Sequence, residues 1–103
     1  MQEVIEKQVK RNVNGQRKKV GVIVATKNKS GGLSIGYSLT KTSVGDVFDV
    51  EHGRKLAIER TKARHLVIPR SLKEEVNKMV DRGHRYFKTG YLGMESMISF
   101  NNS

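Results

Sequence analysis

Residues 45–64, GDVFDVEHGRKLAIERTKAR, combine the side chains that acid–base chemistry or anion binding would use. The acidic residues and His52 could supply a general acid or base, and five Lys or Arg side chains occupy positions 54–64. Carboxylates just before and within the first turn of a helix are also what capping and the helix dipole favour. We therefore expect Asp49 to cap a helix rather than to act in catalysis.

The sequence lacks the patterns of known catalytic and metal sites. His52, His65 and His84 are scattered without metal-ligand spacing. Cysteine is absent, which excludes thiol nucleophiles, disulfides and cysteine–zinc sites. Neither a Gly-x-Ser-x-Gly elbow nor a phosphate-binding loop occurs. We predict a protein that is not an enzyme and that needs no metal and no cofactor.

Several side chains are candidates for binding a phosphate-bearing ligand. They are Tyr37, Lys41, Phe48, Arg54, Arg60 and Arg64. The cations would pair with phosphates, and one of the two aromatic rings would offer a flat face to a base. Arg60 and Arg64 share a helix face and could clamp one phosphate, whereas Arg54 and Arg60 differ by about 240° around the axis. A second subunit would therefore have to complete the site, which predicts a homo-oligomer. Solvated surface arginines are the alternative interpretation.

The charge balance favours a negatively charged partner. Twenty Lys and Arg against ten Asp and Glu give a formal charge of +10. Such an excess is typical of proteins that bind nucleic acid, although no helix-turn-helix, zinc-finger or aromatic-rich RNA-binding signature is present. Any nucleic-acid binding is therefore expected to be independent of sequence.

The first half of the chain predicts strands. Residues 3–13 fit either a helix or a strand, and the Asn14-Gly15 turn that follows favours a strand in a hairpin. Residues 18–28 are rich in β-branched side chains, with Val20, Val22 and Val24 expected on one face of a strand buried on both sides. In the next strand we expect Leu33, Ile35, Tyr37 and Leu39 to point inward and Ser34, Gly36, Ser38 and Thr40 outward. Gly36 is expected to allow a tight helix contact.

The second half predicts two helices. After Asp49, the small residues Gly53 and Ala57 lie four apart and would let a helix approach the sheet closely. A second helix is expected from about Leu72 to Phe87, with Ser71 and Glu74 forming a capping box.

These elements predict an α+β fold in which a two- or three-stranded antiparallel sheet is followed by two helices, with one sheet and one helical layer. A chain of 103 residues can bury one modest core, so residues 1–103 are expected to form a single domain. The apolar tail, residues 89–103, is expected to be partly mobile and to pack on the domain or on a neighbouring subunit. Because no apolar run approaches about 20 residues, we expect no membrane contact. Cysteine is absent and nothing in the sequence indicates secretion, so we expect a cytoplasmic location.

Four segments, VGVIVAT, SIGYSLTK, GDVFDVEHGRKLAIERT and RGHRYFK, resemble small proteins encoded by bacteriophages. The resemblance covers about residues 18–88. In size, origin and charge, the chain is similar in kind to the counter-defence proteins of phages, which sequester cyclic-nucleotide immune signals without cleaving them. The resemblance implies a phage anti-defence protein in the host cytoplasm that binds a cyclic nucleotide. The alternatives are sequence-independent binding of DNA or RNA, and inhibition of a host protein through the apolar C-terminal tail.

Overall fold

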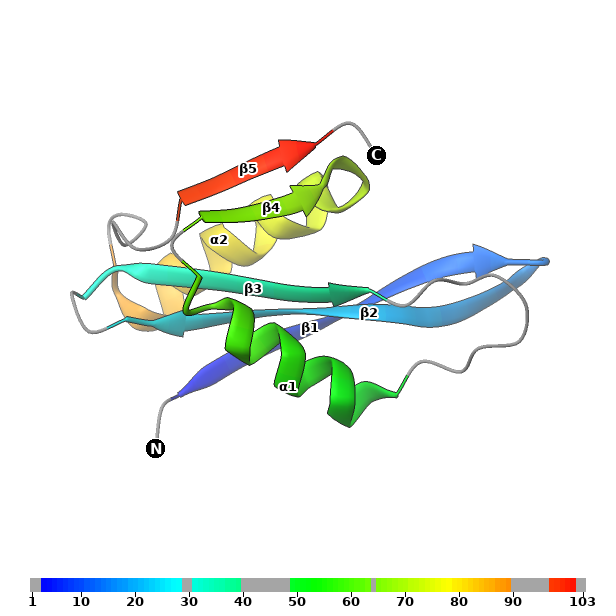
Figure 1. Cartoon of the computed structure of the whole chain (residues 1–103), viewed down its shortest axis with the longest axis horizontal. Coiled ribbons are helices and arrows are strands. Elements are labelled where there is room, and N and C mark those ends of the chain that lie inside the picture. The colour runs from blue at the N-terminus through cyan, green and yellow to red at the C-terminus, as the bar shows by residue number, and fades with distance from the viewer. Residues whose placement is uncertain (1–2, 29–30, 40–48, 64, 90–96, 102–103) are drawn as a thin grey trace.

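The computed structural model describes residues 3–28, 31–39, 49–63, 65–89 and 97–101, and it confirms the α+β class. Its elements in chain order are β1 (Val4–Val13), β2 (Gln16–Lys27), β3 (Leu33–Leu39), α1 (Val50–Arg60), β4 (His65–Pro69), a 3₁₀ turn (Arg70–Leu72), α2 (Lys73–Phe87) and β5 (Met97–Asn101). Strands β1, β2 and β3 form an antiparallel sheet in that order, and β4 and β5 form a second, smaller sheet (Figure 1).

The β1–β2 hairpin confirms the strand interpretation of the N-terminal segment. Asn14 and Gly15 have φ angles of 51° and 79°, which is the left-handed pair that a tight hairpin turn requires. Pairing runs from Val4 opposite Thr26 to Val13 opposite Gln16. The hairpin is therefore much longer than β3, which pairs only with Gly21–Lys27 of β2.

The register of the hairpin shifts by one residue after Val9. Val9 lies opposite Gly21 and the next residue of β1 lies opposite Lys19, so Val20 is an extra residue in a β-bulge. We predicted that Val20 shares a face with Val22. The bulge instead turns Val20 into the core cluster on the other face, so that prediction was wrong.

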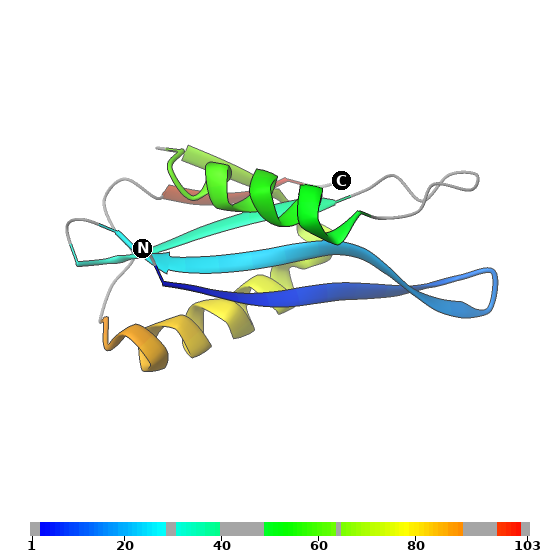
Figure 2. The ribbon, with the colours of Figure 1, turned by 90° about the horizontal axis from the view of Figure 1, so that it is seen from below.

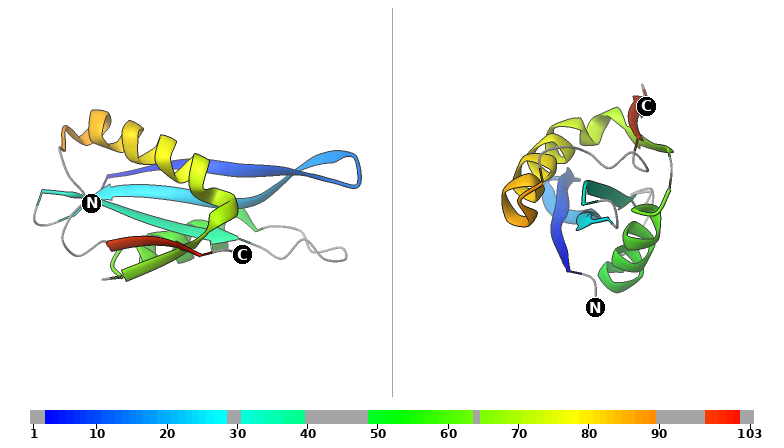
Figure 3. Two further views of the ribbon diagram at one scale, coloured as in Figure 1. Left: turned by 90° about the horizontal axis from the view of Figure 1, so that it is seen from above. Right: turned by 90° about the vertical axis from the view of Figure 1, so that its left-hand side faces the viewer.

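The two helices cover opposite faces of the three-stranded sheet (Figure 2). On one face α1 packs through Ala57 on Val22 and Val24. On the other, α2 packs on the larger core cluster, which includes Ile23 and Leu33. The prediction of one helical layer was wrong because β2 is apolar on both faces, and each face must be covered. The end-on view in Figure 3 shows the sheet between the two helices.

The alternation predicted for β3 is confirmed for Leu33, Ile35 and Tyr37, which lie in or against the main core cluster, and it is wrong for Leu39. Leu39 is exposed, whereas Ser34 and Ser38 are buried. α1 packs on the face that we predicted to point outward, and there the hydroxyl of Ser38 donates a hydrogen bond of 2.8 Å to the Gly53 carbonyl. The helix thus supplies the partner that a buried hydroxyl needs.

α1 begins and packs as the sequence predicted. Asp49 is its N-cap, and one carboxylate oxygen accepts a hydrogen bond of 3.2 Å from the amide of His52. Gly53 and Ala57 are its buried residues. A β-carbon at Gly36 would collide with the carbonyl oxygen of Ala57, which confirms the tight helix contact.

α2 starts within one residue of its predicted position, but it is not capped as predicted. Leu72 occupies the N-cap position and no side chain caps the helix, so the expected Ser71–Glu74 capping box is wrong. Leu72 is buried in the core, and a 3₁₀ turn precedes the helix in place of an extended cap. The helix buries Val76, Met79, Gly83 and Phe87.

The C-terminal strand pairs with β4, and the sequence did not predict either strand. β5 runs parallel to β4, from His65 opposite Met97 to Pro69 opposite Asn101. Ile98 and Phe100 are partly buried against the core, which confirms that this part of the tail packs on the domain. The predicted mobility of the tail stays a prediction.

Candidate functional site

The structure describes three of the six predicted ligand-binding residues, namely Tyr37, Arg54 and Arg60. Lys41, Phe48 and Arg64 lie outside the described residues. Each of the three described side chains already has a partner within the chain.

Arg54 forms an ion pair with Glu6 of β1. The Nε of Arg54 lies 2.8 Å from Oε1 of Glu6, and Nη2 donates a hydrogen bond of 3.2 Å to Oε2. The fork of the guanidinium is therefore occupied by a carboxylate that lies 48 positions earlier in the chain. The contact ties α1 to β1 and leaves Arg54 a structural role.

Arg60 lies against Tyr37. Its guanidinium carbon is 5.0 Å from the centre of the tyrosine ring, and Nη1 donates a hydrogen bond of 2.8 Å to the carbonyl oxygen of Tyr37. The tyrosine hydroxyl donates to the carbonyl oxygen of Val67 at 3.1 Å, which links β3 to β4. The structure thus brings Arg60 and Tyr37 together as a pair and leaves Arg54 apart from them.

A second cationic region, which the sequence analysis did not single out, occupies the end of the β1–β2 hairpin. We call residues 10–19 the basic arm. Its cations are Lys10, Arg11, Arg17, Lys18 and Lys19, and it contains no Asp or Glu. All except Arg11 are exposed. The arm lies beyond the part of β2 that pairs with β3, and its turn projects past both helices (Figure 2).

Like charges face each other across the arm. Lys10 lies opposite Lys19, and Arg11 lies opposite Lys18. Directly opposite residues of an antiparallel pair have neighbouring side chains on the same face, so each pair repels and weakens the hairpin. A negative partner would remove this repulsion.

Arg11 joins the base of the arm to the start of α2. One nitrogen of its guanidinium lies 2.9 Å from Oε1 of Glu75 and donates a hydrogen bond of 3.0 Å to the carbonyl oxygen of Ser71. The other terminal nitrogen donates to the carbonyl oxygen of Lys10 at 2.9 Å. These contacts fix the direction in which the arm leaves the domain.

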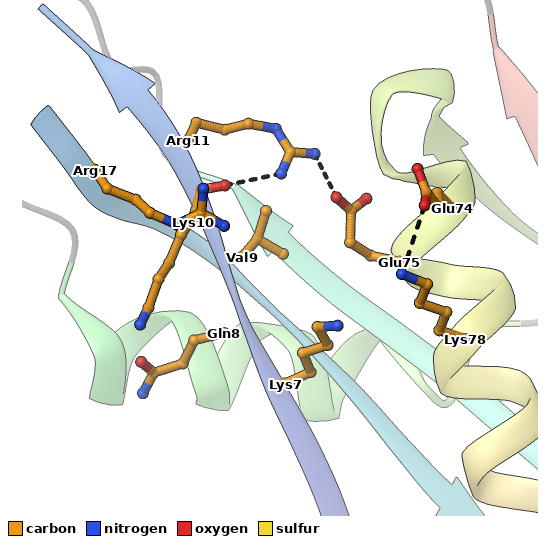
Figure 4. Close-up of a pocket in the computed structure, with 9 residues that line it drawn as sticks. All are labelled: Lys7, Gln8, Val9, Lys10, Arg11, Arg17, Glu74, Glu75 and Lys78. Atoms are coloured by element: carbon orange, nitrogen blue, oxygen red, sulfur yellow. Dashed lines mark hydrogen bonds and ion pairs between the residues drawn. The ribbon is translucent and has the colours of Figure 1, made fainter. Parts of the chain in front are cut away.

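A hollow of about 370 Å³ lies between β1 and α2 at the base of the arm (Figure 4). We call it the β1–α2 hollow. Its cations are Lys7, Lys10, Arg11, Arg17 and Lys78, and its other lining residues are Gln8, Val9, Glu74 and Glu75. Lys7 and Arg11 extend from β1 toward α2, whereas Gln8 and Lys10 extend to the other side of the strand.

An adjoining hollow of about 300 Å³ shares Lys7 and Lys78 and continues along α2 to Arg82 and Arg85. Neither hollow is lined by Tyr37, Arg54 or Arg60. The cations of the arm therefore continue into a row of cations beside the helix.

The acidic residues of this region are already paired within the chain. Glu75 pairs with Arg11, and Glu74 and Asp81 lie 3.5 and 3.0 Å from Lys78 and Arg85 respectively. The last two pairs are exposed and contribute little. Lys7 and the four exposed cations of the arm have no ion pair among the described residues, so the region keeps a large positive excess.

One sequence signal could have identified the arm. Residues 7–19 carry six Lys or Arg without an acidic residue, whereas residues 54–64 carry five and include Glu59. Residues 7–19 are therefore the more basic of the two segments, by net charge.

The arrangement can bind a row of phosphates, because its cations project from one strand pair and one helix.

Within the described residues there is no group of three or more His, Asp or Glu that could hold a metal ion. Neither α1 nor α2, the helices of the described part, has the length and hydrophobicity needed to cross a bilayer.

No protein-family model, curated protein or solved structure matches this chain.

Proposed function

We propose that this protein binds nucleic acid independently of sequence, with the basic arm lying along the phosphate backbone. Phosphate contacts from Lys and Arg supply nearly all of the affinity in such complexes, and they do not read bases. A two-stranded ribbon is narrow enough to enter a groove of a duplex or to lie along a single strand.

One observation carries the proposal: the arm places lysine opposite lysine and arginine opposite lysine, with no carboxylate between residues 10 and 19. A hairpin selected only for stability would place opposite charges across the strands. The repulsion is accounted for when a polyanion lies over the arm and neutralises both strands.

The sequestration of a cyclic nucleotide stays a prediction that no contact of the described residues supports. Arg54 is held by Glu6, and Arg60 covers the tyrosine ring that was expected to stack on a base. The predicted homo-oligomer also stays a prediction. Inhibition of a host protein through the tail has less support, because Ile98 and Phe100 pack against the core.

The proposal is tested by measuring how salt weakens binding to a labelled DNA duplex of about 20 base pairs, by fluorescence anisotropy between about 50 and 300 mM NaCl. If each of the four exposed cations of the arm contacts one phosphate, log K falls with log salt with a slope of about −3.6. Lys18→Gln/Lys19→Gln should reduce the slope by roughly 1.8, because two of these contacts are lost.

Lys55→Gln/Lys62→Gln is the matched control, since it removes the same charge from exposed positions on α1 and just after it. Its slope should stay at the wild-type value. Equal slopes for the two double variants, or no binding at low salt, would contradict the proposal.

A further inference from the structure

We propose that the β1–α2 hollow binds a ribose phosphate unit, so that the nucleic acid on the arm is RNA. This inference rests on the proposed function and adds the class of nucleic acid. It depends on three features of the hollow: its continuity with the arm, its excess of cations, and one carboxylate oxygen without a hydrogen-bond partner among the described residues.

The hollow continues the arm. Arg11 and Arg17 belong to the arm and also line the hollow. A backbone whose phosphates follow the arm toward the domain therefore reaches the space between β1 and α2 next (Figure 4).

The hollow offers cations to a phosphate. Lys7 extends toward α2 and has no ion pair among the described residues. Lys78 faces it from α2, and the 3.5 Å pair of Lys78 with Glu74 is exposed on both sides. An exposed pair of this kind exchanges easily for a phosphate.

Glu75 offers a hydrogen-bond acceptor to a sugar. Its Oε1 is paired with Arg11, but its Oε2 is buried and accepts no hydrogen bond from any described residue, while a fifth of the side-chain surface stays exposed. A buried acceptor without a donor destabilises the fold, so a ligand that brings a donor gains affinity. A phosphodiester has no donor to give. A ribose 2′-hydroxyl has one, and DNA lacks it.

The lining also argues against recognition of the bases. None of the nine described residues that line the hollow is aromatic, so they offer no ring to stack on a base. Cations and one carboxylate fit a sugar and its phosphate, whatever base is attached.

The test compares three labelled single strands of one sequence, built only from A and C so that the bases are identical in RNA, DNA and 2′-O-methyl RNA. Affinities are measured by fluorescence anisotropy at one low salt concentration. We expect RNA to bind about tenfold more tightly than DNA, because only RNA satisfies the acceptor. The 2′-O-methyl strand should behave like DNA, because methylation removes the donor.

Two variants locate the effect. Glu75→Ala removes a negative charge from the hollow, and Glu59→Ala removes one from an exposed position on α1, so both raise general affinity for polyanions. The ratio of RNA to DNA affinity should fall to about one for Glu75→Ala and stay at the wild-type value for Glu59→Ala. A denaturation curve confirms that both variants are folded.

The outcomes separate the two proposals. Equal affinity of the wild type for RNA and DNA, or a preference that survives Glu75→Ala, overturns the inference and leaves the function of the arm intact. Failure of all three strands to bind overturns the proposed function itself. Displacement of the RNA by micromolar AMP or a cyclic dinucleotide would assign the hollow to a free nucleotide and overturn its assignment to RNA.

Discussion

Whether an arginine forms an ion pair within the chain determines whether it can bind an external anion. Arg54 is held by Glu6, and Arg11 is held by Glu75. All four side chains are partly exposed, so each pair is worth about 0.2–1 kcal/mol and mainly fixes direction. Arg17 and Lys18 meet no carboxylate among the described residues, and they are free to bind an external anion.

Two glycines at helix contacts differ in what an added methyl group would meet. At Gly36 it would collide with the backbone of Ala57, whereas at Gly83 it would meet the end of the Leu33 side chain at 2.7 Å. Gly36→Ala should lower the free energy of unfolding by about 1–3 kcal/mol or more, because a backbone carbonyl cannot turn aside.

Gly83→Ala should lower it by less than about 1 kcal/mol, because Leu33 can change rotamer and alanine favours the helix by a similar amount. Urea denaturation measures both values. Equal losses would show that α1 does not pack on β3 as closely as described.

At the scale of the element, repulsion between opposite cations of the arm lowers the stability of the β1–β2 hairpin. Lys19→Glu would place a carboxylate opposite Lys10. The repulsive pair becomes attractive, so the free energy of unfolding should rise by about 0.2–1 kcal/mol. The same change should lower affinity for the DNA duplex by tenfold or more at low salt, since a cation is lost and an anion gained.

Urea denaturation and fluorescence anisotropy on the one variant measure both effects. Lys62→Glu, at an exposed position just after α1, makes the same change in charge away from the arm and serves as the reference. A variant that loses both stability and affinity would mean that Lys10 and Lys19 do not face each other.

Most features that local patterns determine were predicted well, although the Ser71–Glu74 capping box was not. The Asn14-Gly15 turn, the Asp49 cap and the apolar stripe of α2 each depend on residues close together in the chain. The bulge at Val20 and the parallel pairing of β4 with β5 depend on partners far away, and short windows of sequence carry no signal for them.

At the scale of the whole molecule, the distinction between local patterns and distant partners explains why the sequence did not locate the site. The segment 54–64 was singled out by its composition, but contacts from distant strands occupy Arg54 and Arg60. The charge of +10 correctly indicated a molecule with excess cations and did not say where they lie. Their location follows from the length of the β1–β2 hairpin, which extends beyond the strand and helices that cover the rest of the sheet.

The central claim is that a polyanion binds at the arm. It is tested most directly by recording backbone amide NMR spectra of the labelled protein during titration with a short RNA strand. We predict that the largest shift changes fall on residues 7–19 and on the first half of α2, with small changes on α1. Largest changes around Tyr37 and Arg60, with the arm unaffected, would contradict the account.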